Sequence, residues 1–411
     1  MIFFVAFPLV SDLAQTSPAT GKSGAPLPST PKAINARVKL IERQASALRG
    51  LKPLRPVTVE FLRSPEFSRK VSALFNSGLT NQDVTIDDQE WVLSGMIPAR
   101  THVRTFLTSA VASQVAGWYS FQTKRLYIRN TGQALGIDRW YIAHEYTHAL
   151  QDQHFNLAKL EPDQSHWEEH DSDEYLAVHS LIEGDAVTIQ DTYMEKYYSA
   201  TEKAALFRQL ESIKSTPLPR VLEEQFDFPY TDGPLYVQYL LRKGGYAAVN
   251  HAFRHPPKTS YELMFPGRSV QVKRVRLTRA LGPFRTWKTD DDDVNGAFGQ
   301  QQLVERYVNS VQAGDLAQLW RGDRYVLIQK GTQYAMLMKS AYTSPTDAQT
   351  AAGIIEQSLA ARFGGLFAYA GGQWGGKDGY YGAIHVDGSH ISLGFARSAS
   401  IARHLAAART K

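Results

Sequence analysis

The stretch His144-Glu145-Tyr146-Thr147-His148 is the part of the chain from which a fold can be inferred. On an α-helix, residues four apart lie on one side of the axis, one turn from each other, so both imidazoles would face the same point. Two imidazole nitrogens at this spacing can bind one Zn²⁺, and Glu145 would lie beside them as the general base that activates a water. Only the two histidines and the glutamate are fixed in this motif, so its interpretation depends on the surrounding sequence.

Residues 136–157 predict one long helix around the motif. Asp138 can cap its first turn, and Ile142, Tyr146 and Ala149 recur on one face. Burying two histidines and a glutamate on so apolar a helix costs free energy unless they have a partner, because each loses its water. A metal ion supplies that partner; a pair of core histidines satisfied by hydrogen bonds is the alternative.

Two β-rich runs, residues 115–119 and 125–129, precede this helix and predict a hairpin across a polar turn. A strand that comes directly before a zinc helix can form the edge of a sheet, where an extended peptide adds by backbone hydrogen bonds. A hairpin that only stabilises the fold is the alternative.

Two residues compete for the third metal ligand. His154 completes the string His-Glu-x-x-His-x-x-Gln-x-x-His, which resembles the metzincin signature except that Gln151 stands where that signature has a glycine for a sharp turn. If the helix continues through Gln151, His154 lies about 9 Å further along the axis than His148 and about 120° away from it. The missing glycine therefore favours Glu183, from a second predicted helix at residues 171–199.

The predicted zinc helix is similar to that of the thermolysin-type gluzincins, in which a following helix supplies a glutamate ligand. Beyond the motif the similarity covers Thr147, Ala149 and Asp152, and Glu183 matches the ligand glutamate. The resemblance implies Zn²⁺ held by His144, His148 and Glu183, with Glu145 as the catalytic base.

Two departures from thermolysin concern the surroundings of the ligands. The spacing from His148 to Glu183 is longer, and Val187 stands where that family has an aspartate one turn past its ligand glutamate. A ligand histidine generally needs an acceptor on its second ring nitrogen, so Asp152 or Asp185 is expected to take that role. For Asp185, a surface carboxylate is the alternative and the better expectation.

A broader resemblance, over residues 50–270, is to secreted bacterial gluzincin-like proteins. The shared motifs are Gly117-Trp118-Tyr119, the helix 144–155, Glu183-Gly184-Asp185-Ala186, the segment 244–249 and Pro256-Pro257. The resemblance implies a zinc hydrolase but supplies no substrate. An oxyanion-stabilising residue is expected downstream among Tyr230, Tyr261 and His251, and a structural or solvated role is expected for His179.

With 411 residues, the chain is longer than one hydrophobic core usually serves, so two domains are expected. The predicted segments are a signal peptide at 1–14, a Ser/Pro/Gly-rich linker at 15–45, a metallopeptidase domain at 46–290 and a smaller C-terminal α+β domain at 291–411. The fold class is α+β. The resemblance implies a zincin-like first domain with a small mixed sheet, an edge hairpin, the active-site helix and a mostly helical second half.

Further elements follow from apolar spacing and turn residues. Helices are expected at 201–215, 235–253, 299–313, 346–363 and 398–409, with breaks at Gly233-Pro234 and Gly244-Gly245, and strands at 320–328, 334–338 and 389–395. The acidic run at 290–293 precedes a helix, where carboxylates normally complement the helix dipole. It lacks the spaced oxygen ligands of an EF-hand loop, and a calcium site there is the alternative.

Composition limits the partners. A net charge of +5 is small for this length, and the basic run at 273–279 lacks interleaved aromatic residues, so a nucleic-acid partner is not expected. The chain has 0 cysteines, which excludes disulfides and a thiol nucleophile. The apolar run at 2–10 has the length of a signal-peptide core and is too short to span a membrane, which favours a secreted or cell-surface protein.

Three functions remain open from the sequence. The first is a zinc endopeptidase that acts on peptides or proteins. The second is another zinc hydrolase, such as an aminopeptidase or amidase, for which no amine-anchoring motif is visible. The third is a binding protein whose zinc is structural or absent, and the presence of Glu145 argues against it because a structural site needs no base.

Overall fold

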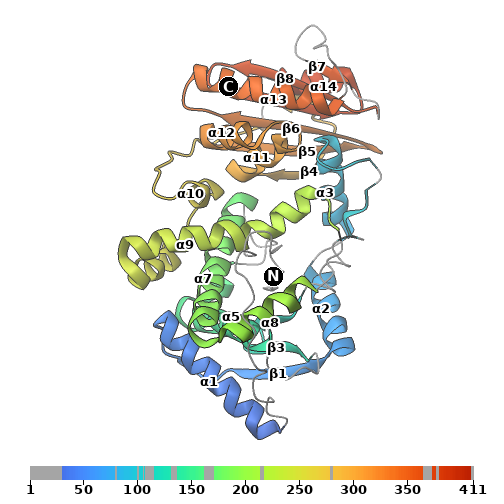
Figure 1. The fold of residues 1–411 in the computed structure, drawn as a ribbon. Coiled ribbons are helices and arrows are strands. Elements are labelled where there is room, and N and C mark those ends of the chain that lie inside the picture. The colour runs from blue at the N-terminus through green and yellow to red at the C-terminus, as the bar shows by residue number, and fades with distance from the viewer. Residues whose placement is uncertain are drawn as a thin grey trace. The chain divides into compact units, whose positions relative to one another are not determined.

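The computed structural model describes residues 30–78, 81–99, 101–104, 106, 115–130, 137–161, 171–212, 217–277, 281–363, 373–375 and 379–408 (Figure 1). The predicted signal peptide and residues 15–29 of the predicted linker lie outside these residues. The chain forms two compact units: Met1–Thr80, Arg104–Asp163 and Val178–Pro256 make up the first, and Asn81–Val103, Gln164–Ala177 and Pro257–Lys411 the second. Both contain helices and strands, so the predicted mixed α+β class is confirmed.

The small sheet of the first unit contains the predicted hairpin. Strand β2 (Gly117–Ser120) pairs antiparallel with β3 (Arg125–Asn130), and β3 pairs in parallel with β1 (Thr58–Arg63). The order is β1-β3-β2, so β2 forms an edge of this sheet among the described residues. The mixed sheet and the hairpin agree with the prediction.

Helices cover both faces of this sheet. Trp118 stacks on its cross-strand partner Tyr127 and packs with Phe67 of α2 (Ser64–Gly78). Tyr119 and Leu126, which alternate with them, face the core that α5 forms. Helix α5 (Ile137–Phe155) carries the histidine motif.

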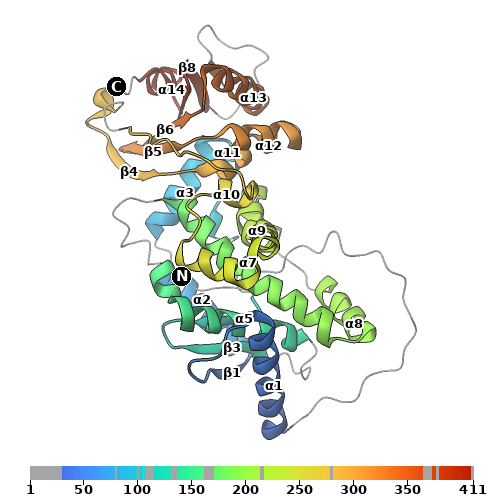
Figure 2. The same ribbon diagram turned by 90° about the vertical axis from the view of Figure 1, so that its left-hand side faces the viewer.

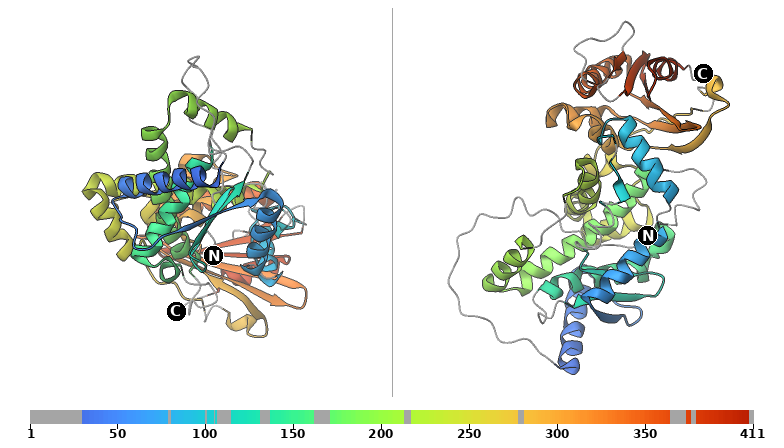
Figure 3. Two further views of the ribbon diagram at one scale, coloured as in Figure 1. Left: turned by 90° about the horizontal axis from the view of Figure 1, so that it is seen from below. Right: turned by 90° about the vertical axis from the view of Figure 1, so that its right-hand side faces the viewer.

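Helix α5 confirms the helix predicted at residues 136–157, although Asp138 lies inside its first turn and does not precede it. Helix α1 (Pro31–Arg49) packs alongside it (Figure 3). Residues 31–45 of the predicted linker are therefore helical. Thr30 caps the start of α1, and Gly50 in the left-handed conformation ends it.

The second half of the first unit is helical, as predicted. Its helices are α6 (Leu157–Leu160), α7 (Ser172–Tyr197, in this unit from Val178 onward), α8 (Ala200–Glu211) and α9 (Arg220–Arg254). Helix α9 kinks at Gly244 and Gly245, where a break is predicted, but it runs through Gly233-Pro234. The second predicted break is wrong because Gly233 packs against α7: a Cβ on Gly233 would lie 2.3 Å from the carbonyl oxygen of Ser180.

The second unit contains an antiparallel sheet in the order β4-β5-β6-β9-β8-β7. The strands are β4 (Lys288–Asp293), β5 (Asp323–Lys330), β6 (Gln333–Ala341), β7 (Gln373–Gly375), β8 (Tyr381–Asp387) and β9 (His390–Ala396). Helices α13 (Pro345–Phe363) and α14 (Ala399–Ala406) both pack against β8 (Figure 2). Gly382 and Gly394 allow this close packing, because a Cβ at either would meet atoms of α13 or α14.

The strands and helices predicted beyond residue 315 are confirmed, but one other prediction for this unit is wrong. The helix expected at 299–313 is two helices, α11 (Gly296–Glu305) and α12 (Ser310–Leu319), because Asn309 and Gln312 form a capping box that starts a new helix. The acidic run at 290–293 lies in strand β4 and precedes α11, as predicted. The unit also contains α3 (Asn81–Leu93), α10 (Ser260–Met264) and the 3₁₀ turn Gly282–Phe284.

The predicted boundary at residue 290 stays a prediction, because compactness does not test which segments fold alone. Among the described helices, none combines the length and the apolar character needed to cross a bilayer.

Candidate metal centre

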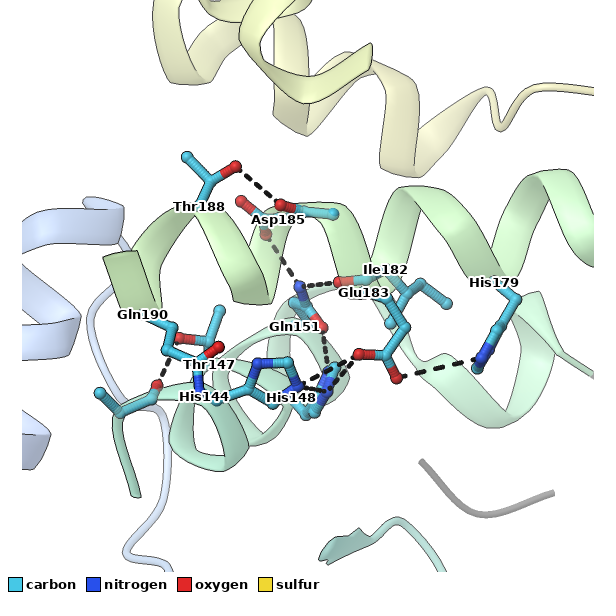
Figure 4. Close-up of polar contacts among 12 residues, drawn as sticks. His144, Thr147, His148, Gln151, His179, Ile182, Glu183, Asp185, Thr188 and Gln190 are labelled. Atoms are coloured by element: carbon cyan, nitrogen blue, oxygen red, sulfur yellow. Dashed lines mark hydrogen bonds and ion pairs between the residues drawn. The ribbon is translucent and has the colours of Figure 1, made fainter. Parts of the chain in front are cut away.

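The structure brings His144, His148 and Glu183 together, as the sequence predicts. The two Nε2 atoms of the histidines are 3.0 Å apart. Oε2 of Glu183 lies 3.1 Å from Nε2 of His144 and 3.5 Å from Nε2 of His148 (Figure 4). Both histidines come from α5 and the glutamate from α7, so the centre is built by two helices.

The spacing of these three atoms fits a zinc ion. Zn²⁺ binds imidazole nitrogen and carboxylate oxygen at about 2.0–2.1 Å, and a tetrahedral arrangement then separates the ligand atoms by roughly 3.3 Å. Among the described residues, this is the one group of at least three His, Cys, Asp or Glu side chains whose ligand atoms all lie within 4.8 Å of one another. Three protein ligands leave a fourth position open, as hydrolytic zinc sites require.

The centre is buried, and its charges are coupled. His144, His148 and Glu183 are at most 1% exposed. Burial lowers the pKa of His144. Burial also opposes the charged form of His148, but the charge of Glu183 and its hydrogen bond outweigh this and raise the pKa of His148 to about 9. Despite its burial, Glu183 has a pKa well below the usual range, because the positive charge of His148 and the hydrogen bonds from both histidines favour its ionised form.

Glu145 lies beside this group without a side-chain partner. Its side chain is 0% exposed, and neither carboxylate oxygen makes a hydrogen bond of normal geometry. Burial, with the charge of Glu183 adding to it, raises the pKa of Glu145 to about 8. A Cβ added at Gly117 would lie 3.3 Å from Cγ of Glu145, so edge strand β2 passes directly beside this carboxylate.

His154 is not part of the group. Helix α5 continues through Gln151 to Phe155, as expected in the absence of the metzincin glycine. His154 points elsewhere and lies 2.8 Å, by its Nε2, from the carbonyl oxygen of Lys52.

The acceptor for His148 is Gln151, which the sequence interpretation missed. Nδ1 of His148 lies 2.9 Å from Oε1 of Gln151, and Nε2 of Gln151 donates to Oδ2 of Asp185 at 2.9 Å. Asp152 faces away from the histidines and accepts from Tyr119 Oη at 2.9 Å. The signal in the sequence is the i,i+3 spacing from His148 to Gln151, which places both side chains on one face of the helix.

Asp185 is likewise not the surface carboxylate that its helix position favours. It is 0% exposed and lies 2.7 Å from Nε of Arg49. No local pattern connects residues 136 positions apart, so this ion pair could not be predicted from the motif.

Two further groups lie near the ligands. Nδ1 of His179 is 2.8 Å from Oε1 of Glu161, and its Nε2 is 4.0 Å from Oε1 of Glu183 (Figure 4). The ring of Tyr230 stacks near that of His144, with 6.5 Å between the ring centroids.

Of the downstream candidates, Tyr230 is the one that the structure places by the histidine pair. The ring of His251 instead contacts that of His255, with the centroids 4.5 Å apart. Tyr261 packs in the core of the second unit with Trp320.

No protein-family model, curated protein or solved structure matches the chain. The gluzincin resemblance therefore stays a prediction that rests on the motifs and on the residues that they bring together.

Proposed function

We propose that the protein is a zinc-dependent metallopeptidase with a gluzincin-like centre on a zincin-like domain. One observation carries the proposal: the carboxylate of Glu145 is buried without a side-chain partner, directly beside three converging metal-ligand side chains. Burying a carboxylate without a side-chain partner in a protein interior costs free energy unless a bound group completes the site. A structural metal site has no use for such a residue, whereas a hydrolytic site needs it as a base.

The residues divide the work in a consistent way. His144, His148 and Glu183 would hold Zn²⁺, which when bound polarises a carbonyl group and lowers the pKa of water. Glu145 would take a proton from the attacking water and then deliver it to the nitrogen of the leaving amine.

A peptide is the substrate class that the surroundings support best. Strand β2 lies at the edge of its sheet among the described residues and passes beside Glu145, so an extended peptide paired with β2 would run past the base. The ring of Tyr230 lies next to that of His144, and its phenol is the group that we assign to stabilising the developing oxyanion.

The test combines zinc content and peptide hydrolysis in the full-length wild type and in Glu145→Gln. We expect about one equivalent of zinc in both, as for a single tetrahedral site. We expect the variant to cleave a peptide library on the order of 10³-fold more slowly, the range for loss of a general base. Glu195→Gln, an exposed change on α7, is the matched control. A Glu145→Gln protein as active as the wild type, or a wild type that takes up no zinc after reconstitution, would sink the proposal.

One observation favours a second function, a binding protein with a structural zinc. All four residues of the centre are at most 1% exposed, so little of the centre is open to a substrate. This alternative predicts zinc in the wild type, no hydrolysis of any peptide, and no difference between the wild type and Glu145→Gln.

A further inference from the structure

We propose that Gln151 is a positioning residue: held by the buried ion pair of Asp185 and Arg49, it fixes which ring nitrogen of His148 faces the metal. The inference rests on the proposed metal centre and extends it to a relay that runs from the end of α1 to a ligand. Its consequence is that metal affinity depends on residues that never contact the metal.

The orientation of the Gln151 amide follows from its neighbours. A glutamine side chain has one acceptor, its oxygen, and one donor group, its nitrogen. The nitrogen lies 3.0 Å from the carbonyl oxygen of Ile182 and 2.9 Å from Oδ2 of Asp185 (Figure 4). Both neighbours accept hydrogen bonds, so the nitrogen must face them and the oxygen must face His148.

The tautomer of His148 follows in turn. Because the Gln151 oxygen can only accept, Nδ1 of His148 must carry the hydrogen of their 2.9 Å bond. A neutral imidazole with its hydrogen on Nδ1 has its lone pair on Nε2. Nε2 is the atom that lies 3.0 Å from Nε2 of His144 and 3.5 Å from Oε2 of Glu183, at the point where the ligand atoms converge.

Arg49 and Asp185 hold the other end of the relay. Oδ2 of Asp185 accepts from Nε of Arg49 at 2.7 Å and from Gln151 at 2.9 Å, and the side chains of both charged residues are 0% exposed. The guanidinium group also lies over the ring of Tyr246, 4.7 Å from its centroid. Removing the arginine would leave a buried carboxylate without its counter-charge, and Asp185 would lose the contact that fixes its orientation.

An amide in this position has a chemical consequence. A carboxylate partner would increase the electron donation of a ligand histidine and add a negative charge next to Glu183 and Glu145. Gln151 fixes the ring without adding charge. The hydrogen bond to Gln151 therefore orients the His148 ring, while a bound Zn²⁺ would keep more of its Lewis acidity than it would beside a carboxylate partner.

The test measures the zinc dissociation constant of the full-length protein by competition with a chelator. Gln151→Leu removes the acceptor at similar volume, and we expect zinc to bind 10- to 100-fold more weakly, the usual cost of losing such a partner. Gln151→Glu keeps the acceptor for His148 but puts a carboxylate oxygen against Asp185 and the carbonyl oxygen of Ile182, so it breaks the relay at its other end and should also bind zinc more weakly than the wild type. Arg49→Met, which leaves Gln151 in place, should weaken binding by several-fold. Gln238→Leu, an exposed change on α9, is the matched control and should bind zinc as the wild type does.

A second measurement needs no variant. Nitrogen chemical shifts of the zinc-loaded wild type should show the ring of His148 with its hydrogen on Nδ1 and the metal on Nε2. Metal on Nδ1, or a folded Gln151→Leu protein with wild-type zinc affinity, would overturn the relay. So would a folded Gln151→Glu protein that binds zinc as tightly as the wild type.

These outcomes separate the relay from the proposed peptidase. A wild type that binds zinc but hydrolyses no peptide ends the proposed function, and the affinities of the variants still decide the relay. A wild type that binds no zinc overturns both.

Discussion

Asp323 in the second unit and the neighbouring Glu145 and Glu183 in the first are all buried, but their carboxylate oxygens are engaged in different ways. In the second unit, Oδ1 of Asp323 accepts from the backbone of Gly296 at 2.9 Å and from Trp320 Nε1 at 2.6 Å, and Oδ2 accepts from the backbone of Asn295 at 2.9 Å. Asp293 is satisfied similarly by Ser172. In the first unit, the oxygens of Glu145 have no side-chain donor, and Glu183 turns one oxygen towards two histidines.

The difference shows what makes a metal site. Backbone N–H groups at the start of a helix complete a carboxylate and fix the local chain, so the oxygens of Asp323 are already engaged. In the first unit the side chains converge on one point, and within the described residues that convergence is found there alone. The number of acidic residues therefore says less than the direction in which their oxygens point.

The largest effect should come from breaking the convergence. Glu183→Gln keeps the size of the side chain but removes the charge that both histidines face. The zinc dissociation constant should therefore rise by more than about 100-fold, which exceeds the loss expected for a residue that contacts a ligand but not the metal. Asp173→Asn is the matched change in the second unit, where the carboxylate is also buried, at 2% exposure. Metal titration of both should show a loss in the first alone; equal losses would mean that buried charge in general, and not convergence, governs affinity.

A smaller effect should follow from forcing apart α9 and the helix that supplies Glu183. A Cβ on Gly233 would lie 2.3 Å from the carbonyl oxygen of Ser180 and 3.1 Å from Cα of Gly184, next to Glu183. Backbone atoms cannot yield as a flexible side chain can, so Gly233→Ala should lower the free energy of unfolding by about 2–4 kcal/mol, at the upper end for overpacking.

The control for this change is Gly314→Ala on α12, where an added Cβ meets nothing within 4 Å. It should stabilise the protein by about 0.5–1 kcal/mol, because alanine favours a helix over glycine. Denaturant unfolding measures both. Equal effects of the two substitutions would show that α7 and α9 can accommodate an added methyl group at Gly233 without strain.

The site is more predictable from sequence than the surroundings that complete it. His144 and His148 follow from helical spacing alone, and Glu183 from the next helix once the missing glycine argues against His154. Gln151 stands out in the sequence only as the replacement of that glycine, although its spacing from His148 indicates a shared face. The contact partners of a residue can be predicted from helical spacing when residue and partner lie on the same helix.

Contacts between distant segments have no such rule. The pairing of Arg49 with Asp185 depends on how α1 packs, and the continuity of α9 through Pro234 depends on the close approach of Gly184 and Gly233. The acidic run at 290–293 has the composition of a helix start, but pairing with β5 makes it a strand. Tertiary packing decides each of these cases over local preference.

The second unit should also differ in its response to pH. Burial raises the pKa of Asp323 from 3.8 to about 7, although its N–H donors oppose this change. Between about pH 4 and pH 7 the folded state therefore holds a proton that the unfolded state has lost, so stability should fall as pH rises through this window and level off above it. We expect a loss on the order of 4 kcal/mol, since each tenfold difference in proton affinity between the two states corresponds to about 1.4 kcal/mol.

Hydrogen exchange of the Asn295 and Gly296 amides reports this effect locally, because both donate to Asp323. Their protection should decrease between about pH 5 and pH 7 after correction for intrinsic rates. Asp323→Asn should be less stable than the wild type at low pH, but its free energy of unfolding should change less with pH. Protection that stays constant across this window in the wild type would mean that the carboxylate is ionised throughout and that its N–H donors outweigh burial.

The smallest effect is expected at the acidic run, where the sequence leaves a calcium site open. Each of the first three aspartates of the run is engaged separately: Asp290 with Lys288 at 2.6 Å, Asp291 with Tyr325 Oη at 3.1 Å, and Asp292 with Arg324 at 2.5 Å. Because these carboxylates point to different partners, millimolar calcium should leave thermal unfolding unchanged. Asp292→Asn should cost no more than about 1 kcal/mol, as for other exposed ion pairs. A stabilisation by calcium that disappears in Asp291→Asn would show that these oxygens can converge on an ion. The second unit would then also contain a metal site, and the convergence of side chains would no longer distinguish the two units.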